Sequence, residues 1–204
     1  MKPYTWPSNK RAIYTKAVHA TLRFTRKALA SGAVYALLAF GGNIAWATSA
    51  NPPSEAVQAI PGLKKLGEGK LSWWGLSIYD SQLWGTATGQ TDFKPNSYWL
   101  ELQYKRSFKG SEIAKKSREE IQDQHPYSPQ KLDAWQAELT RIFPEVVKGD
   151  TLSALYLPGQ PMRFWHNNKP LATLADPELA TAFMGIWLDP KTSDPELRAK
   201  LLGL

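Results

Sequence analysis

Few residues in this chain could carry out chemistry. The chain contains no cysteine, which excludes thiol catalysis, zinc–thiolate sites and disulfides. Beyond residue 47 it has two histidines, His125 and His166, so a metal site built from several histidines is excluded as well. His125 precedes Pro126 and His166 flanks an Asn-Asn turn, so a structural or surface role is the preferred interpretation of both. We therefore predict no catalytic residue, no metal ion and no cofactor.

One short segment looks like a phosphate-binding loop and fails the test. It reads Gly67-Glu68-Gly69-Lys70. A P-loop requires a further glycine five positions before the second glycine, and Ser or Thr directly after the lysine. The chain has Lys64 and Leu71 at these two positions, so we reject a phosphate site here.

Cationic side chains next to aromatic residues are the remaining candidates. One interpretation is that their stems lie over aromatic faces at the edge of a sheet. The other is a cation at the mouth of an apolar pocket, where it would meet an anionic ligand head. For that pocket Arg106 and Arg163 are the candidate cations, and Tyr79 and Tyr104 are the candidate hydroxyls. Trp73 completes the set of candidate ligand-binding residues.

The first 47 residues differ in composition from the rest. They hold seven basic residues and no acidic one, which accounts for the whole net charge of +7 and leaves a neutral remainder. The high isoelectric point therefore gives no support for nucleic-acid binding. A basic stretch, an apolar stretch over 28–47 and the motif Ala45-Trp46-Ala47 predict a signal peptide over 1–47 and a periplasmic or secreted protein. The alternative is an uncleaved anchor facing the periplasm.

The remaining residues predict a lead-in over 48–65 and one domain over 66–204. Tyr98 to Lys105 alternates as a half-buried strand does. Three helix starts share a capping side chain followed by proline, at Ser128-Pro129, Asp176-Pro177 and Asp194-Pro195. Antiparallel strands covered on one side by helices make an α+β domain. The expected strands are 66–84, 98–105, 151–157, 162–166 and 171–174, and the expected helices are 112–122, 129–143, 177–187 and 195–202.

Two of the predicted helices have informative side-chain patterns. In the first, Lys116 stands four residues from Glu112 and from Glu120, a spacing typical of a solvated face. In the second, Leu132, Trp135, Leu139 and Ile142 form an apolar stripe. We expect this stripe, with Trp135, to be buried against the sheet.

Three stretches resemble the chalcone isomerase-like family. They are a strand within 67–84, a strand running into a helix over 100–117, and a tail with Leu157-Pro-Gly-Gln, Phe164-Trp-His-Asn and 185–193. The tail resembles the exported bacterial branch of the family. The resemblance implies an open-faced β-sandwich, in which a large antiparallel sheet is covered by a layer of helices.

The resemblance also bears on catalysis. The plant enzymes of this fold close a chalcone into a flavanone, using a strand Arg, a strand Thr and a Tyr, Lys and Asn at a strand-to-helix junction. The Thr falls near Trp74, which is expected to fill that space, and no Arg occurs near 62–64. The Tyr, Lys and Asn fall near Lys109, Glu112 and Lys116. Isomerase activity of the usual kind is therefore not expected.

Other members of this fold resemble fatty-acid-binding proteins, and that role survives loss of the catalytic residues. The resulting hypothesis is an exported, non-catalytic protein that binds a small apolar or amphipathic molecule such as a fatty acid. It contacts a membrane only through its N-terminal segment. One alternative is an intramolecular lyase or isomerase of chalcone-isomerase type with an altered site, and another is a structural or interaction protein. No oligomeric state is predicted.

Overall fold

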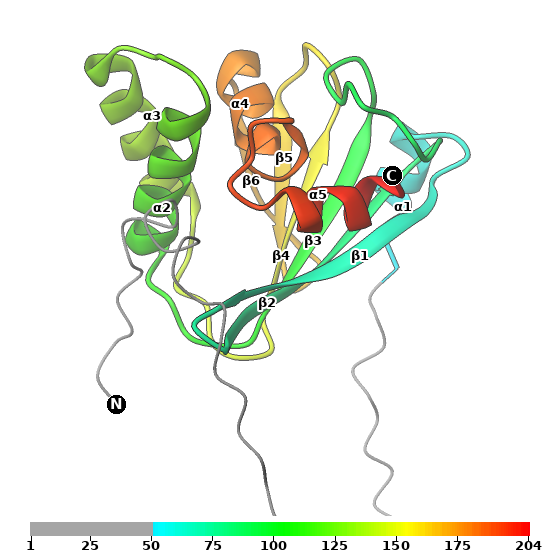
Figure 1. Cartoon of the computed structure of the whole chain (residues 1–204), viewed down its shortest axis with the longest axis horizontal. Coiled ribbons are helices and arrows are strands. Elements are labelled where there is room, and N and C mark those ends of the chain that lie inside the picture. The colour runs from blue at the N-terminus through cyan, green and yellow to red at the C-terminus, as the bar shows by residue number, and fades with distance from the viewer. Residues whose placement is uncertain (1–50) are drawn as a thin grey trace, which may run out of the picture.

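The computed structural model describes residues 51–204. The predicted leader over 1–47 lies outside the described residues. Six antiparallel strands pair in chain order (Figure 1), and each pairs with the next along the chain. The strands are β1 (Lys64–Trp73), β2 (Leu76–Gly85), β3 (Tyr98–Tyr104), β4 (Thr151–Tyr156), β5 (Met162–His166) and β6 (Lys169–Leu174). The helices are α1 (Ser54–Ala59), α2 (Gly110–Gln124), α3 (Pro129–Ile142), α4 (Pro177–Leu188) and α5 (Pro195–Leu202).

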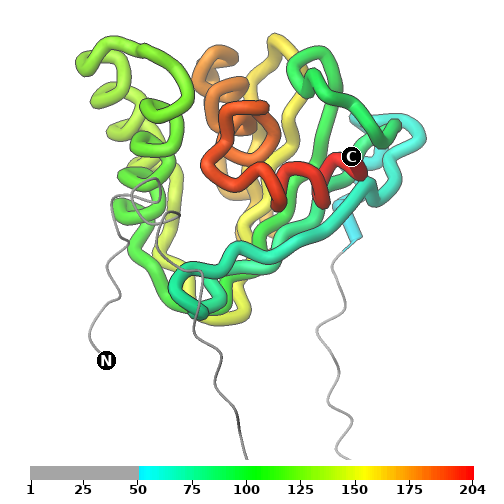
Figure 2. Tube along the Cα trace, in the orientation of Figure 1, coloured from blue at the N-terminus to red at the C-terminus, as the bar shows by residue number. Residues whose placement is uncertain are grey.

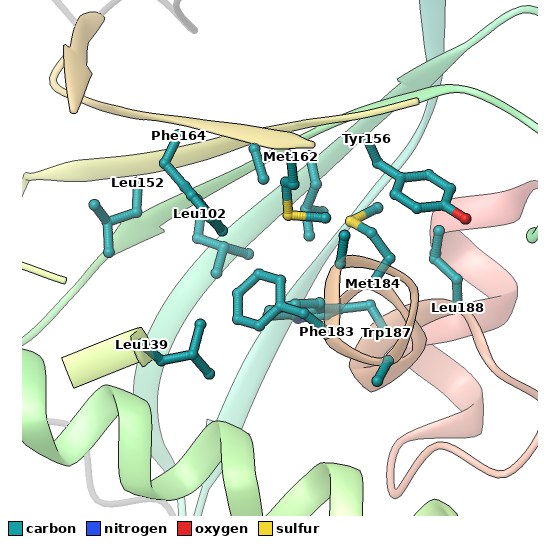
Figure 3. Close-up of a cluster of buried hydrophobic side chains, with 14 of the residues drawn as sticks. Leu102, Leu139, Leu152, Tyr156, Met162, Phe164, Phe183, Met184, Trp187 and Leu188 are labelled. Carbon is teal, nitrogen blue, oxygen red and sulfur yellow. The ribbon is translucent and has the colours of Figure 1, made fainter. Parts of the chain in front are cut away.

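The longer helices form a layer on one face of the sheet. Figure 2 shows α2 and α3 running together beside α4, while α5 crosses in front of the N-terminal strands. The main core lies between this layer and the sheet: in Figure 3, Leu102 and Phe164 of the sheet point toward Phe183 and Trp187 of α4. The predicted α+β fold with an antiparallel sheet and a layer of helices is confirmed.

The opposite face of the sheet is covered in part by α1. Ala56 and Ile60 are buried there against Trp99, Leu155 and Trp165. The segment 48–65, predicted as a lead-in to the domain, therefore contains this packed helix, and β1 begins within it at Lys64. The helix has six residues, too few for a periodicity signal, so tertiary burial decides its formation.

The predicted strand over 66–84 is in fact a hairpin. β1 and β2 pair with Trp73 opposite Leu76, and Trp74 and Gly75 form the turn between them with φ of 49° and 72°. Two successive residues with positive φ match the type I′ turn, whose twist suits a two-residue hairpin. Bulky residues on both sides of the turn concealed the Trp-Gly signal in the sequence.

The glycines of the rejected phosphate loop have a packing role. Gly67 and Gly69 lie on the face of β1 that α5 crosses. A β-carbon at Gly67 would come within 1.9 Å of the carbonyl oxygen of Lys200, and one at Gly69 within 2.4 Å of a methyl carbon of Leu197. Glycine therefore permits α5 to lie directly against β1.

Three helices begin as predicted, with a capping side chain followed by proline. The Ser128 hydroxyl accepts a hydrogen bond from the Lys131 N–H (3.3 Å) at the start of α3. The carboxylate of Asp176 accepts from the N–H groups of Glu178 and Leu179 at the start of α4, and Asp194 caps α5 in the same way. Each cap satisfies amide groups that a helix start leaves unpaired.

Candidate functional site

A cavity of about 80 Å³ lies between the inner face of the sheet and helices α2, α4 and α5. One water molecule needs roughly 10–15 Å³ by the same measure, so the cavity has room for a small group of atoms. Most of its wall is apolar. The wall includes Leu71, Leu102, Phe143, Phe164, Phe183 and Leu197.

Two tyrosines stand side by side in the cavity wall. Tyr79 on β2 is directly opposite Tyr104 on β3, and strand alternation turns both toward the helices. Their rings meet edge to face with centroids 5.9 Å apart. The indole N–H of Trp187 on α4 donates a hydrogen bond to the Tyr79 hydroxyl (3.0 Å).

Both hydroxyls remain neutral in this environment. Burial raises the pKa of Tyr104 far above its usual value, and burial does the same to Tyr79. The nearby carboxylates of Glu120 and Asp194 raise the pKa of Tyr79 further, although the hydrogen bond from Trp187 lowers it. Neither tyrosine can therefore act as a phenolate near neutral pH, and each remains a hydroxyl that can donate a hydrogen bond.

Besides Ser153 on β4, the polar lining residues come from two segments, α2 and the connection between α4 and α5, and we call the side chains of these two segments together the polar edge. It consists of Lys116, Ser117, Glu120, Thr192, Ser193 and Asp194. The Lys116 Nζ lies 3.0 Å from a Glu120 oxygen and 3.5 Å from a Glu119 oxygen. The side chains of Lys116 and Glu120 are 12% and 10% exposed, so this ion pair is largely withdrawn from water.

The polar edge corrects one expectation from the sequence. Lys116 and Glu120 were predicted on a solvated face of the helix because of their spacing. The spacing of four residues also fits a pair that faces a cavity, and only the docking of α2 distinguishes the two cases. Sequence reasoning missed these residues as site candidates for this reason.

The candidate ligand-binding residues fall into two groups. Tyr79 and Tyr104 line the cavity, whereas Trp73 is half-buried at the end of β1 and is not part of the lining. Arg106 follows β3 and does not line the cavity either. Arg163 lies on the opposite face of the sheet, where it pairs with Glu55 and stands 5.8 Å from the centre of the Trp165 ring.

The placement of Arg163 corrects its assignment to the pocket mouth. Its neighbours Met162 and Phe164 point into the main core, so a side chain between them must point to the other face. The cation that reaches the cavity is instead Lys116.

Of the positions carried over from the plant enzymes, only Lys116 lines the cavity. Trp74 is 68% exposed in the β1–β2 turn, so the expectation that it fills the cavity is wrong. Lys109 and Glu112 form the start of α2, where a Glu112 oxygen accepts a hydrogen bond from the Lys109 N–H (3.0 Å). Lys116 lies on the cavity wall.

A second cavity, of about 250 Å³, lies along α4 beside the end of α2. Its wall is more polar and includes His125, whose Nε2 lies 3.1 Å from an Asp189 oxygen. Among residues 51–204, no three His, Asp or Glu side chains are placed to hold a metal ion. The apolar cavity beneath the helices is therefore the stronger candidate for a ligand site.

Comparison with known proteins assigns the family. A model of the chalcone isomerase-like family matches residues 77–203, which is more than half of the sequence. The chain belongs to the chalcone isomerase-like family. The match begins in β2 and ends beyond α5, so it includes most of the cavity wall.

Two further proteins are similar to this chain. An uncharacterized protein of Haemophilus influenzae (strain ATCC 51907 / DSM 11121 / KW20 / Rd) is 27% identical over 139 residues, covering 68% of this chain and 67% of that protein. The crystal structure of a fatty-acid binding protein of Arabidopsis thaliana is similar with a TM-score of 0.56 and 12% identity, covering 70% of this chain and 87% of that chain. At this identity the second likeness supports the fold alone.

Proposed function

We propose that this protein binds a small amphipathic molecule, such as a fatty acid, in the cavity beneath α2, α4 and α5, and that it does so without catalysis. The observation that carries the proposal is an apolar cavity whose wall also holds polar groups from α2 and from the connection between α4 and α5. The similar fold of a fatty-acid binding protein supports this use of the architecture. The positions that correspond to the isomerase Thr, Tyr, Lys and Asn hold Trp74, Lys109, Glu112 and Lys116 instead, which supports a role without catalysis.

The energetics favour an apolar chain inside and a polar head at the edge. Each buried methylene group contributes about 0.8 kcal/mol to binding. Ligand pockets commonly measure roughly 300–1,000 Å³, whereas this cavity measures about 80 Å³. A chain of more than a few carbons must therefore displace side chains such as Phe183 or Trp187. We therefore expect the affinity to rise with chain length and then to level off when the accessible space is filled.

Fluorescence titration tests this proposal. The Trp187 ring lines the cavity and its N–H is bonded to Tyr79, so an occupant should change its emission. Straight-chain fatty acids and alcohols of increasing length should quench the emission saturably. The matched variant Trp187→Phe should bind but lose most of the signal. If no amphiphile of any length binds, the proposal fails, and accelerated cyclisation of a chalcone would favour an isomerase instead.

We propose further that the protein is exported through its N-terminal segment and belongs to the exported bacterial branch of the family. The support is the acid-free basic leader with its Ala45-Trp46-Ala47 motif. Within residues 51–204 no helix is long and apolar enough to cross a membrane. N-terminal sequencing of the purified protein should give Thr48 or a nearby residue. An intact Met1 on protein from the soluble cytoplasmic fraction would contradict export.

A further inference from the structure

We propose that the cavity prefers amphiphiles with an uncharged, hydroxyl-bearing head, so that among the ligands of the proposed function a fatty alcohol binds more tightly than an ionised fatty acid of the same length. This selectivity rests on the proposed binding function and concerns the same site. It follows from the charges and hydrogen-bonding groups of the polar edge.

The first argument is the charge balance. Among the described residues that line the cavity there is one cation, Lys116, and there are two carboxylates, Glu120 and Asp194. Lys116 is already paired with Glu120 and, at its outer side, with Glu119. A carboxylate head would have to displace Glu120 from Lys116 or lie unpaired beside two negative groups. Like charges brought together at a desolvated site oppose binding.

The second argument is the use of hydroxyl hydrogens. The Ser117 hydroxyl donates to the carbonyl oxygen of Ile113 (2.9 Å), and the Thr192 hydroxyl donates to that of Ile186 (2.6 Å). Both hydroxyls therefore offer a ligand only lone pairs. With the two carboxylates they make the polar edge rich in acceptors, so a ligand head that donates is favoured.

The tyrosines complete the match to a hydroxyl. The Tyr79 oxygen accepts a hydrogen bond from Trp187, and its own hydroxyl hydrogen is not used in that bond. A ligand hydroxyl can accept from a tyrosine and donate to a carboxylate at once, whereas an ionised carboxylate can only accept. Neutral polar heads are therefore the complementary class.

A pair of ligands of equal length tests the selectivity. Decan-1-ol and decanoate are titrated at pH 8, where decanoate is ionised, with the emission of Trp187 as the signal. We expect the alcohol to bind at least about tenfold more tightly. A general preference of apolar sites for uncharged molecules would give the same sign, so variants must decide.

Glu120→Gln is the informative variant, because it removes one carboxylate with little change of shape. It should lower the preference for the alcohol by about tenfold, whereas Lys116→Gln should raise it. Glu138→Gln changes the net charge equally on the surface of α3 and should leave the preference within about twofold. Thermal unfolding confirms that each variant is folded.

The outcomes separate the two proposals. If decanoate binds as tightly as the alcohol, or if Glu120→Gln and Lys116→Gln leave the preference unchanged, head-group selection by the polar edge is wrong while binding stands. If neither ligand binds, the proposed function is wrong and the selectivity falls with it.

Discussion

Trp135 on α3 is hydrogen-bonded to Asp176, the residue that caps α4, and its replacement gives a sharp test of the structure. The side chain is 5% exposed on α3, and its indole N–H donates to an Asp176 carboxylate oxygen (2.9 Å). The other Asp176 oxygen caps α4 by accepting from the N–H groups of Glu178 and Leu179. One tryptophan therefore contributes both packing and the orientation of a helix cap.

These two contributions can be separated in magnitude. Trp135→Ala leaves a cavity and should lower the free energy of unfolding by about 3–5 kcal/mol. Trp135→Phe keeps much of the apolar contact, including the edge-to-face contact with Tyr127, whose ring centroid lies 4.7 Å from that of Trp135. It loses the hydrogen bond to the charged carboxylate of Asp176. That loss should be about 1.5–3 kcal/mol.

Equilibrium unfolding in urea measures these differences, and a double-mutant cycle assigns them. Asp176→Ala should lose about 0.5–2 kcal/mol for the cap in addition to the Trp135 bond. The Trp135–Asp176 hydrogen bond is lost in each single variant, Trp135→Phe and Asp176→Ala, but only once in the double variant. The two single losses of unfolding free energy should therefore sum to more than the loss in the double variant. A loss below about 1 kcal/mol for Trp135→Ala, the range of surface substitutions, would refute the burial of this residue. Strict additivity in the cycle would refute the hydrogen bond.

Three further predictions concern stability. Gly67→Ala should cost more than about 3 kcal/mol in urea unfolding, because its β-carbon would meet the Lys200 carbonyl oxygen at 1.9 Å; a loss under 1 kcal/mol would contradict the close packing of α5. Trp74→Asn should leave stability unchanged or raise it by up to about 1 kcal/mol, since Asn-Gly favours the type I′ turn, and a clear loss of unfolding free energy would show that Trp74 packs. Burial raises the pKa of Glu101, and the bond from Ser153 only partly offsets this, so the folded state retains its proton to higher pH than the unfolded state. The contribution of Glu101 to the free energy of unfolding is fully present below the pKa of the unfolded state, about 4.3, and is lost as the pH rises through the pKa of the folded state. Melting temperatures from pH 4 to 8 should therefore fall less for Glu101→Gln than for the native chain, and parallel curves would contradict the raised pKa.

The sequence by itself determined the features that depend on neighbouring residues. The caps at Ser128, Asp176 and Asp194 are local hydrogen bonds, and the structure has all three where the Ser-Pro and Asp-Pro pairs predict them. The strand at β3 and the turn at Asn167-Asn168 are local in the same sense, since they reflect strand period and tolerance of positive φ. Together with the family resemblance they determined the α+β class. The half-buried character predicted for β3 is wrong, because its second face is buried as well, with Trp99 packed against Ala56 and Ile60.

Tertiary structure decided which faces meet. In the sequence, Arg163 and Tyr104 were equally good candidates for the pocket. In the structure, β5 turns Arg163 toward α1 on one face of the sheet, whereas β3 turns Tyr104 toward α2, α4 and α5 on the other. The spacing of Lys116 and Glu120 was visible, whereas their position at the cavity depends on how α2 docks. Local patterns define elements because their energies come from adjacent residues. A site brings together side chains far apart in the chain, so its composition is decided only when the elements pack.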